Sequence, residues 1–172
     1  MEEFQEILDY RKNGTQNVVK YFVVVEAAFH CTGDWVQGPI GNCYKFVNDP
    51  KVTWSLAQSL CAEMGGALVR LESWIEIYSI RGYRTKNSKL QNNNYWIGGY
   101  KMTDGKWVWK GQRENNPITT SDWAPGEPNN SGGIEGCAHL IGQNSNKNLS
   151  YKWNDISCNH KLPFICEKNK VN

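Results

Sequence analysis

The sequence predicts an α+β domain that is held together by disulfide bonds. Two helix patterns with recognisable starts and ends, a series of short strand patterns, and six cysteines lead to this prediction. The chain has 172 residues, which is enough for one domain that buries a hydrophobic core without help.

The two helix patterns lie in the first half of the chain. The first runs from about Thr53 to Met64, with a capping threonine at its start, one apolar face, and a Gly-Gly pair after its end. The second begins at Ser73, where Ser73-Trp-Ile-Glu76 fits a capping box. We expect the second helix to end at Gly82.

The other patterns are short strands joined by long loops. Residues 110–136 show no regular pattern and contain much Asn, Gly and Pro. A loop of that length inside a compact domain is usually functional or disordered. The predicted strands are Ala67–Leu71, Tyr95–Gly99, Lys106–Trp109, Cys137–Ile141, Tyr151–Asn154 and Pro163–Glu167.

The cysteines favour an oxidising compartment. Their number is even and none forms a C-x-x-C pair, so the usual zinc and thioredoxin spacings are missing. We therefore expect three disulfides, with six free buried thiols as the alternative. Six cysteines allow about 15 connectivities, and the count alone does not choose among them. The six are Cys31, Cys43, Cys61, Cys137, Cys158 and Cys166.

Two further features bear on the compartment. Met1 is followed by acidic residues and not by the basic and apolar segments of a signal peptide. We expect a secreted chain whose signal was removed, because the cysteines weigh against a cytosolic one. Three glycosylation triplets, at Asn13, Asn129 and Asn148, suit a secreted glycoprotein.

Several functional classes are excluded by composition. The net charge is +2 and the charges are scattered, so no basic face for nucleic acid is expected. The most apolar stretch, Tyr21–Val25, is far shorter than the ~20 residues of a membrane-spanning helix. An enzyme is not expected, because no catalytic motif accompanies the three histidines and paired cysteines leave no nucleophilic thiol. These histidines are His30, His139 and His160.

Residues 1–30 differ from the rest because they contain neither Cys nor Trp. Apolar residues at 18, 22, 25 and 29 form a heptad-like stripe, which predicts a helical neck that could pair chains. The β-branched run Val23–Val25 suits a strand equally well. The simpler alternative is an N-terminal extension lying on the domain.

Two polar clusters predict a calcium site. Five side chains in them offer hard oxygen atoms and none offers the sulfur or nitrogen that zinc prefers. Calcium takes six to eight oxygens. An X-Pro bond can be cis at small cost, which would turn the residues on either side of Pro128 toward one point. The alternative is a solvated acidic loop. The five residues are Glu127, Asn129, Glu135, Asn154 and Asp155.

In combination, these pieces resemble the C-type lectin-like domain over residues 31–167. The matching motifs include Thr53-Trp-Ser-Leu-Ala-Gln58, Trp96-Ile-Gly-Gly99, Trp107-Val-Trp109, Trp123-Ala-Pro-Gly-Glu-Pro-Asn129, Trp153-Asn-Asp155 and Pro163-Phe-Ile-Cys166. The resemblance implies a fold in which two helices flank small antiparallel sheets and a long loop carries the calcium site. It also implies the long-form disulfides Cys31–Cys43, Cys61–Cys166 and Cys137–Cys158.

The resemblance further implies a sugar-binding mechanism. Two adjacent sugar hydroxyls would become ligands of the calcium ion, and four of the five residues would also hydrogen-bond those hydroxyls. Asp155 would hold the ion only. Glu-Pro-Asn, in place of Gln-Pro-Asp, is the mannose-type signature of the family and implies mannose, fucose or N-acetylglucosamine. The four sugar-binding residues are Glu127, Asn129, Glu135 and Asn154.

The sequence departs from the family at several points. A second calcium site of many members needs acids where Asn130 and Gly136 stand, so we expect one calcium ion. The segment between Cys137 and Trp153 is an insertion. Asn129 cannot be both glycosylated and a calcium ligand, and we expect it to be unmodified.

The strongest competing function is a protein-binding module of the same fold without sugar activity. Such members usually lack one or more of the five ligands, and all five are present here. The expected partners are therefore glycans or glycoproteins, including microbial surface sugars. A single shallow sugar contact is weak, so oligomers would help binding.

Overall fold

The computed structural model describes residues 5–6, 22–23, 30–111, 115–144 and 146–168. The chain divides into two compact units, Met1–His30 and Cys31–Asn172. In the first unit, strand β1 (Gln5–Glu6) pairs antiparallel with β2 (Phe22–Val23). At β2 the chain therefore forms a strand and not the predicted helix of the neck. A strand was the alternative that the β-branched run Val23–Val25 suggested. The rest of the predicted neck lies outside the described residues.

The second unit is built on one mixed sheet. Its main path runs β10-β9-β6-β11-β4-β3, with β5 paired to β11 and β7 and β8 extending from β6. Among these described strands, every pairing is antiparallel except the parallel contact between β11 and β6. The strands are β3 (Val36–Gln37), β4 (Cys43–Val52), β5 (Ala67–Leu68), β6 (Tyr95–Lys101), β7 (Trp107–Trp109), β8 (Asn116–Pro117), β9 (Cys137–Leu140), β10 (Trp153–Ile156) and β11 (Leu162–Lys168).

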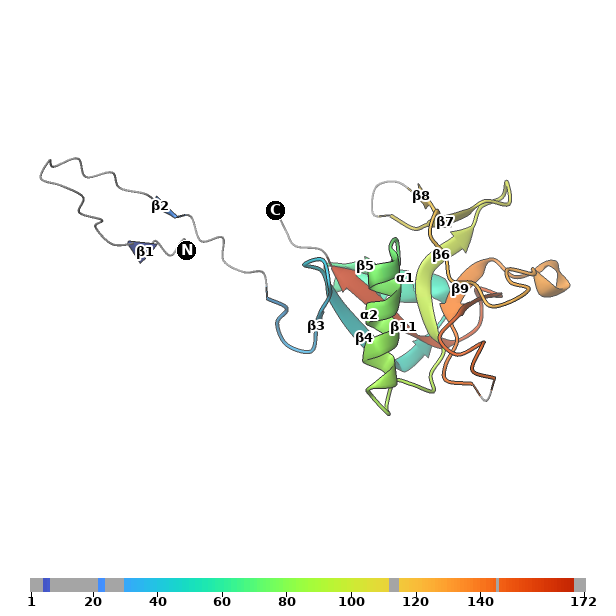
Figure 1. The fold of residues 1–172 in the computed structure, drawn as a ribbon. Helices are drawn as coiled ribbons and strands as arrows, with labels where there is room; N and C mark the ends of the chain where they lie inside the picture. Colours follow the sequence, from blue (N-terminus) through green and yellow to red (C-terminus); the bar gives the residue numbers. More distant parts are fainter. Residues whose placement is uncertain (1–4, 7–21, 24–29, 112–114, 145, 169–172) are drawn as a thin grey trace, which may run out of the picture. The chain divides into compact units, whose positions relative to one another are not determined.

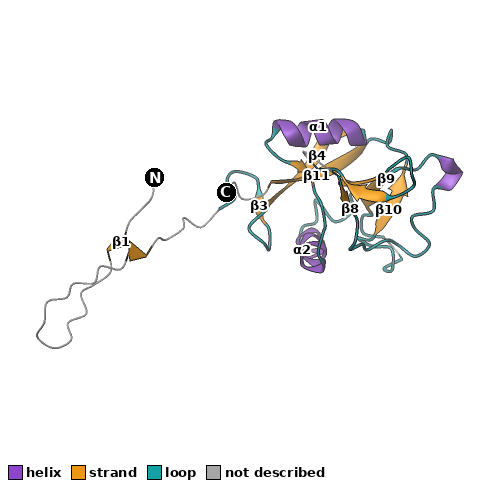
Figure 2. Cartoon of the chain, turned by 90° about the horizontal axis from the view of Figure 1, so that it is seen from above, coloured by secondary structure: helices purple, strands orange, loops and turns teal. Residues whose placement is uncertain are grey.

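The two predicted helices are present as α1 (Trp54–Glu63) and α2 (Trp74–Thr85). They lie on opposite sides of β4 and β11 (Figures 1 and 2), which confirms that two helices flank the sheet. This arrangement, the mixed sheet and the disulfides confirm the predicted α+β fold class.

The helix ends differ in part from the prediction. Ser73 caps α2, because its Oγ accepts from the backbone N–H of Glu76 at 3.4 Å and donates to the Glu76 carboxylate at 2.8 Å. Thr53 occupies the N-cap of α1 but makes no capping hydrogen bond through its side chain. The α2 helix continues past Gly82 to Thr85, so the predicted end was wrong.

The core has two parts, one on each side of the sheet. On β6 the side chains alternate, so that Tyr95 and Ile97 face one cluster and Trp96 faces the other. On β11, Ile165 joins the first cluster and Phe164 joins the second. The first cluster includes residues of α2, and the second includes residues of α1. Each helix is therefore held by its own layer of apolar side chains.

The three disulfides join Cys31 to Cys43, Cys61 to Cys166, and Cys137 to Cys158. They are the pairings implied by the resemblance, and all six cysteines are paired. In the described part of the chain, no helix combines the length and the apolar character that a membrane crossing needs.

Candidate functional site

The long loop after β8 is fixed to strand β10 at its base. The backbone N–H of Trp153 donates to the carbonyl of Asp122 at 3.0 Å, and Ala124 N–H donates to the carbonyl of Trp153 at 2.8 Å. Between these bonds, Trp123 and Trp153 pack edge to face with centroids 5.6 Å apart. The base of the loop is therefore joined to the sheet by a short backbone bridge. This bridge fixes the position from which the chain continues into the polar residues of the loop.

A buried carboxylate also ties this base to α2. The Asp122 side chain is 3 % exposed and pairs with both Arg81 and Lys152. Arg81 comes from α2, and Lys152 precedes β10. A buried carboxylate needs partners to offset its lost hydration, and here two cations supply them.

Beyond this base, Glu127 and Asn129 lie against each other. The Glu127–Pro128 peptide bond is cis. The Asn129 side chain donates to Glu127 Oε1 at 3.0 Å, and the Asn129 backbone N–H donates to Glu127 Oε2 at 3.1 Å. The two predicted ligands on either side of Pro128 are thus brought together.

Asp155 on β10 joins the two polar clusters. Its Oδ1 accepts from the backbone N–H of Asn129 at 3.0 Å, and its Oδ2 accepts from the backbone N–H of Asn130 at 2.9 Å. The Asp155 side chain is fully buried. Twenty-five residues separate it in sequence from Asn130, so these bonds hold two distant segments in one place.

Glu135 closes the loop on the other side. Its Oε2 accepts from the backbone N–H of Ser131 at 2.7 Å, and Asn129 Oδ1 accepts from the same N–H at 2.8 Å. The backbone N–H of Glu135 in turn donates to Asn130 Oδ1 at 3.1 Å. The carboxylate of Glu135 and the amide oxygen of Asn129 therefore converge on one donor.

Asn154 is placed differently from the other four predicted residues. On β10 it lies opposite His139 of β9, and its Nδ2 lies 3.3 Å from His139 Nε2. Burial lowers the pKa of His139 to about 4, so the ring is neutral near pH 7 and its Nε2 can accept from the amide. Within the described residues, the Asn154 side chain makes no hydrogen bond to the side chains of the other four.

The electrostatics of the cluster favour a cation. Burial raises the pKa of Glu127, and a hydrogen bond and like charge from Asp155 and the charge of Glu135 raise it further. Carboxylates that raise one another's pKa are stabilised when a cation lies between them. Among the described residues, no three His, Cys, Asp or Glu side chains group closely enough to hold a metal by themselves. The candidate set therefore needs its asparagine oxygens as well.

The donor set fits a hard cation. Every predicted side chain offers a carboxylate or amide oxygen, which suits calcium and does not suit zinc. Each carboxylate oxygen in the bonds above has a second lone pair, so a backbone hydrogen bond leaves it able to bind a cation. Two residues that the sequence analysis did not assign to the site, Asn130 and His139, hold it in shape.

The comparison with protein families decides the identity of the fold. The Lectin C-type domain model matches residues 50–168.

The chain belongs to the C-type lectin family.

Its relatives include perlucin of Haliotis laevigata, 37 % identical over 76 % of this chain and 78 % of perlucin. Among solved structures, SPL-1 in complex with GlcNAc is 26 % identical, with a TM-score of 0.69 over 84 % of this chain and 99 % of that one. The cow CD23 C-type carbohydrate-recognition domain, crystallised in the presence of the oligosaccharide GlcNAc2Man3, is 28 % identical, with a TM-score of 0.66 over 83 % and 98 % of the two chains.

Family membership bears on two of the predictions, that the chain is not an enzyme and that it has the C-type lectin fold. The family is one of carbohydrate-recognition domains and not of enzymes, which confirms that the chain is not an enzyme. The solved relatives with bound or added glycans have the same fold as this C-type lectin domain.

Proposed function

We propose that this domain is a calcium-dependent lectin for mannose-type sugars. The observation that carries the proposal is the hydrogen-bonded cluster of Glu127, Asn129, Glu135 and Asp155, drawn from two distant segments. A fold could leave these acids apart and solvated. Their convergence, at the electrostatic cost that the raised pKa of Glu127 reflects, favours a site built for a cation.

The five residues would have the roles in calcium and sugar binding that the family pattern implies. Calcium, when bound, supplies an electrophilic centre that attracts sugar hydroxyl oxygens. Glu127 and Glu135 would accept hydrogen bonds from two adjacent hydroxyls, and the amide of Asn129 would donate to the same hydroxyls. Asn154 would donate to them on releasing one of the two bonds that its Nδ2 makes, to His139 and to the Asp155 carbonyl. Asp155 would hold the ion only, because its buried carboxylate is already shared between two backbone N–H groups.

One calcium ion per domain is part of the proposal. A second site would draw on Asp104, but its carboxylate pairs with the Lys106 ammonium at 2.9 Å and accepts from the Lys106 backbone N–H at 3.1 Å. The pKa of Asp104 is lowered by this bonding to Lys106. Beside the proposed site stand Asn130 and Gly136, which bring no carboxylate to a second ion.

The relatives support the kind of partner, and the disulfides support the compartment. SPL-1 was solved with GlcNAc and cow CD23 in the presence of a mannose-containing oligosaccharide. Three disulfides suit an oxidising compartment. The proposal is therefore a secreted lectin that binds glycans or glycoproteins, including those of microbes, with oligomers raising avidity.

The first test is retention on mannose-agarose in calcium, followed by elution with a chelator. We expect retention that the chelator abolishes, and elution by free mannose at lower concentration than by free galactose. Isothermal titration should give about one calcium ion per chain. A chain that neither binds the column nor takes up calcium would overturn the proposal and leave the protein-binding module as the function.

Variants would assign the sugar contacts. Exchanging acid and amide in Glu127→Gln with Asn129→Asp reverses which side donates and which accepts, so we expect preference to move from mannose toward galactose. Glu63→Gln removes an exposed acid of α1 and serves as the control. A glycan found on Asn129 by mass spectrometry would contradict the calcium site.

A further inference from the structure

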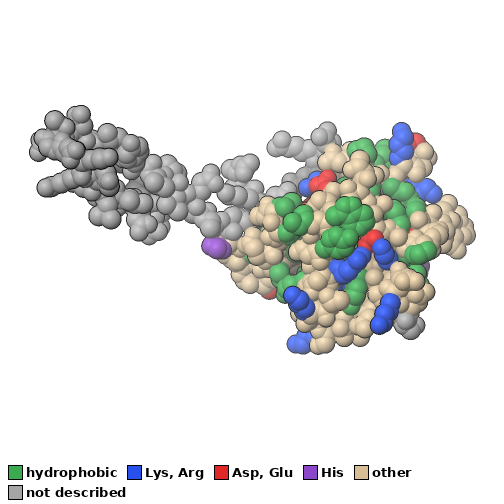
Figure 3. Space-filling model, in the orientation of Figure 1, with side chains coloured by type: hydrophobic (Ala, Val, Ile, Leu, Met, Phe, Trp, Pro, Cys, Tyr) green, Lys and Arg blue, Asp and Glu red, His purple; other side chains and the backbone are tan. Residues whose placement is uncertain are grey.

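The outer face of α2 exposes aromatic side chains that the proposed calcium site does not use. Trp74 is 49 % exposed, Tyr78 is 58 % exposed, and Ile75 beside them is 56 % exposed. The rings of Trp74 and Tyr78 stack with centroids 5.7 Å apart and planes 27° apart. Figure 3 shows hydrophobic side chains gathered over α2, with basic side chains beside them. Large aromatic side chains left half exposed in one patch indicate a binding surface.

A cationic cluster continues this aromatic stack along the helix. Residues 74, 78 and 81 follow the helix spacing of four and three, so they lie in one line. The Arg81 guanidinium lies 5.5 Å from the centre of the Tyr78 ring. Arg81 and Lys152 share the single carboxylate of Asp122, so the cluster keeps one net positive charge. Both cations keep access to solvent, at 28 % and 31 % exposure, whereas Asp122 is buried.

We propose that this face, formed by Trp74, Ile75, Tyr78, Arg81 and Lys152, binds an anionic glycan chain independently of calcium. The C–H face of a sugar ring packs against the electron-rich face of an aromatic ring. A sulfate or carboxylate on the same chain pairs with Arg81 and Lys152. The C–H face and the anionic group of an acidic sugar can thus both be bound by side chains within two turns of α2, Trp74 and Tyr78 for the first and Arg81 for the second.

The surface fits an acidic sugar better than a lipid bilayer. Binding to anionic lipids by charge takes clusters of roughly four to eight basic residues, and this face offers two. Three apolar side chains on a single helix face also give little area to bury in a membrane. The nearby acid Glu72 pairs with Arg70 at 3.9 Å and does not neutralise the two cations.

The proposed surface contains none of the five proposed calcium ligands, and only Arg81 and Lys152 touch the base of the calcium loop, through Asp122. Both Figures 1 and 2 place α2 apart from the 3-10 turn at Ser131–Gly133 that belongs to the calcium loop. A chelator therefore separates the two: it would abolish mannose binding and leave the acidic glycan bound. The inference stands whether or not the calcium proposal holds.

The test uses the full chain with a chelator present. Sulfated dextran oligosaccharides are titrated at low salt and compared with unsulfated dextran of equal length. We expect binding to the sulfated probe only, weakened about five-fold by Trp74→Ala and about as much by Tyr78→Ala. Arg81→Gln should weaken binding and reduce its salt dependence. Lys152→Gln repeats this test from the other cation. Because Arg81 and Lys152 both pair with buried Asp122, circular dichroism must first show that each variant is folded as the unaltered chain is.

Two control variants remove exposed side chains elsewhere: Leu56→Ala on α1 and Lys51→Gln on β4. Both should bind the sulfated probe as the unaltered chain does. Equal binding of unsulfated dextran would overturn the proposal. So would normal binding by folded Trp74→Ala and Tyr78→Ala, which would reduce the effect to general attraction of a polyanion. Binding to phosphatidylserine vesicles without binding to the oligosaccharide would assign the face to membranes instead.

Discussion

The amide of Asn154 has a donor end and an acceptor end, and two acceptors fix which end faces the site. Its Nδ2 lies 3.3 Å from Nε2 of neutral His139 and donates to the backbone carbonyl of Asp155 at 2.5 Å, so the Oδ1 end is turned away from the ring. His139 is 4 % exposed and packs edge-on against Trp96, so its position is fixed. We infer that His139 acts as a positioning residue for the carbonyl oxygen of Asn154.

Replacing His139 should therefore weaken calcium binding without contact between its ring and the ion. We expect His139→Leu to lower calcium affinity about ten-fold, the smaller end of the effect seen when supporting residues of metal sites are changed. His139→Gln, which keeps an acceptor, should restore part of the loss. Calcium titration by calorimetry measures both, with exposed His160→Leu as control. Unchanged affinity in folded His139→Leu would contradict the positioning role.

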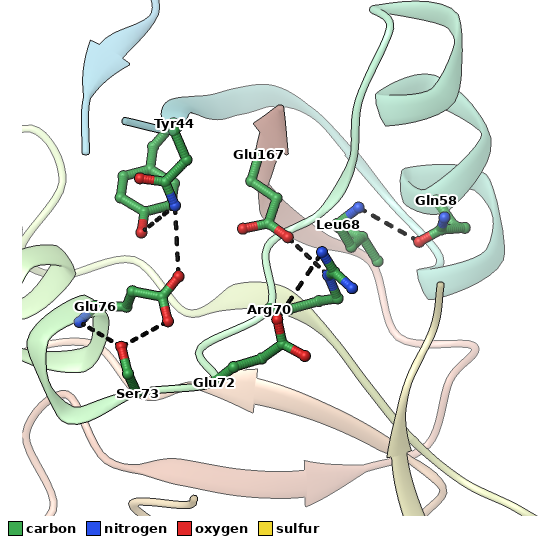
Figure 4. Close-up of polar contacts among 9 residues, drawn as sticks. Tyr44, Gln58, Leu68, Arg70, Glu72, Ser73, Glu76 and Glu167 are labelled. Carbon is green, nitrogen blue, oxygen red and sulfur yellow. Dashed lines mark hydrogen bonds and ion pairs between the residues drawn. The ribbon is translucent and has the colours of Figure 1, made fainter. Parts of the chain in front are cut away.

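On strand β11, Glu167 is a buried carboxyl whose one strong side-chain partner among the described residues is Arg70. It is 4 % exposed, and Arg70 Nε donates to its Oε1 at 2.9 Å (Figure 4). Burial raises the pKa of Glu167 to about 7, although Arg70 opposes the shift. The folded state therefore holds a proton on Glu167 at pH values where the unfolded chain has lost it.

This shift predicts how stability depends on pH. The contribution of Glu167 is full below pH 4.5, its ordinary pKa, and is lost as the pH rises through about 7. The loss amounts to at most about 3 kcal/mol. Glu167→Gln should make the free energy of unfolding, measured with urea, flatter between these pH values than in the unaltered chain. Identical pH profiles for the two proteins would show that Arg70 keeps Glu167 ionised.

Residue types made the oxygen donors of the site predictable, but not the residues that hold them. Glu127 and Asp155 carry chemistry that is visible in the sequence. The roles of Asn130 and His139 come from strand register and loop closure, because His139 meets Asn154 only through the pairing of β9 with β10. Local sequence contains no signal for such a cross-strand pair.

At the scale of elements, α2 passes through Gly82 because its far end is used for packing. Arg84 is fully buried, and its Nη2 donates to the carbonyls of Asn93 and Ile141 at 2.6 and 3.1 Å. These bonds anchor the last turn of the helix and override the tendency of glycine to end it. Apart from its chain neighbours and the backbone of its own helix, no atom lies within 4 Å of the place where a Cβ of residue 82 would be.

Gly82→Ala should therefore stabilise the domain. Alanine fits without a clash and loses less backbone entropy in a helix, so we expect the free energy of unfolding to rise by about 0.5–1 kcal/mol. Urea unfolding followed by circular dichroism measures the change. Gly142→Ala provides the contrast, because its Cβ would overlap the carbonyl of Asn92, and it should destabilise. A loss of stability in Gly82→Ala would show that the glycine is needed for packing.

The helices were predicted from local signals, whereas several strands were not. Helix periodicity and the Ser73 cap need no partner to be recognised. The ten-residue strand β4 was missed, because Asn48, Asp49 and Pro50 interrupt its apolar pattern and it is held by pairing with β11. The last strands were recognised to within two residues, since their apolar alternation is stronger.

At the scale of the whole molecule, two disulfides connect distant parts in different ways. Cys61–Cys166 ties α1 to β11 across 105 residues of sequence. Cys137–Cys158 spans 21 residues and joins the two segments of the candidate site, because Cys137 follows Glu135 closely and Cys158 comes shortly after Asp155. The first bond constrains the overall chain, and the second constrains the segments that carry the proposed ligands.

Removing each bond in turn should therefore rank the two differently. Loss of Cys61–Cys166 should cost more stability, and loss of Cys137–Cys158 should cost more calcium affinity. By chain entropy, Cys61→Ser with Cys166→Ser costs about 5 kcal/mol, and Cys137→Ser with Cys158→Ser costs about 3 kcal/mol. We expect the second pair of changes to lower calcium affinity more, because it frees Glu135 from the strand that carries Asp155. Urea unfolding and calcium titration at a temperature where both variants stay folded provide the comparison. If calcium affinity instead followed stability in both variants, the Cys137–Cys158 bond would have no specific role in the site.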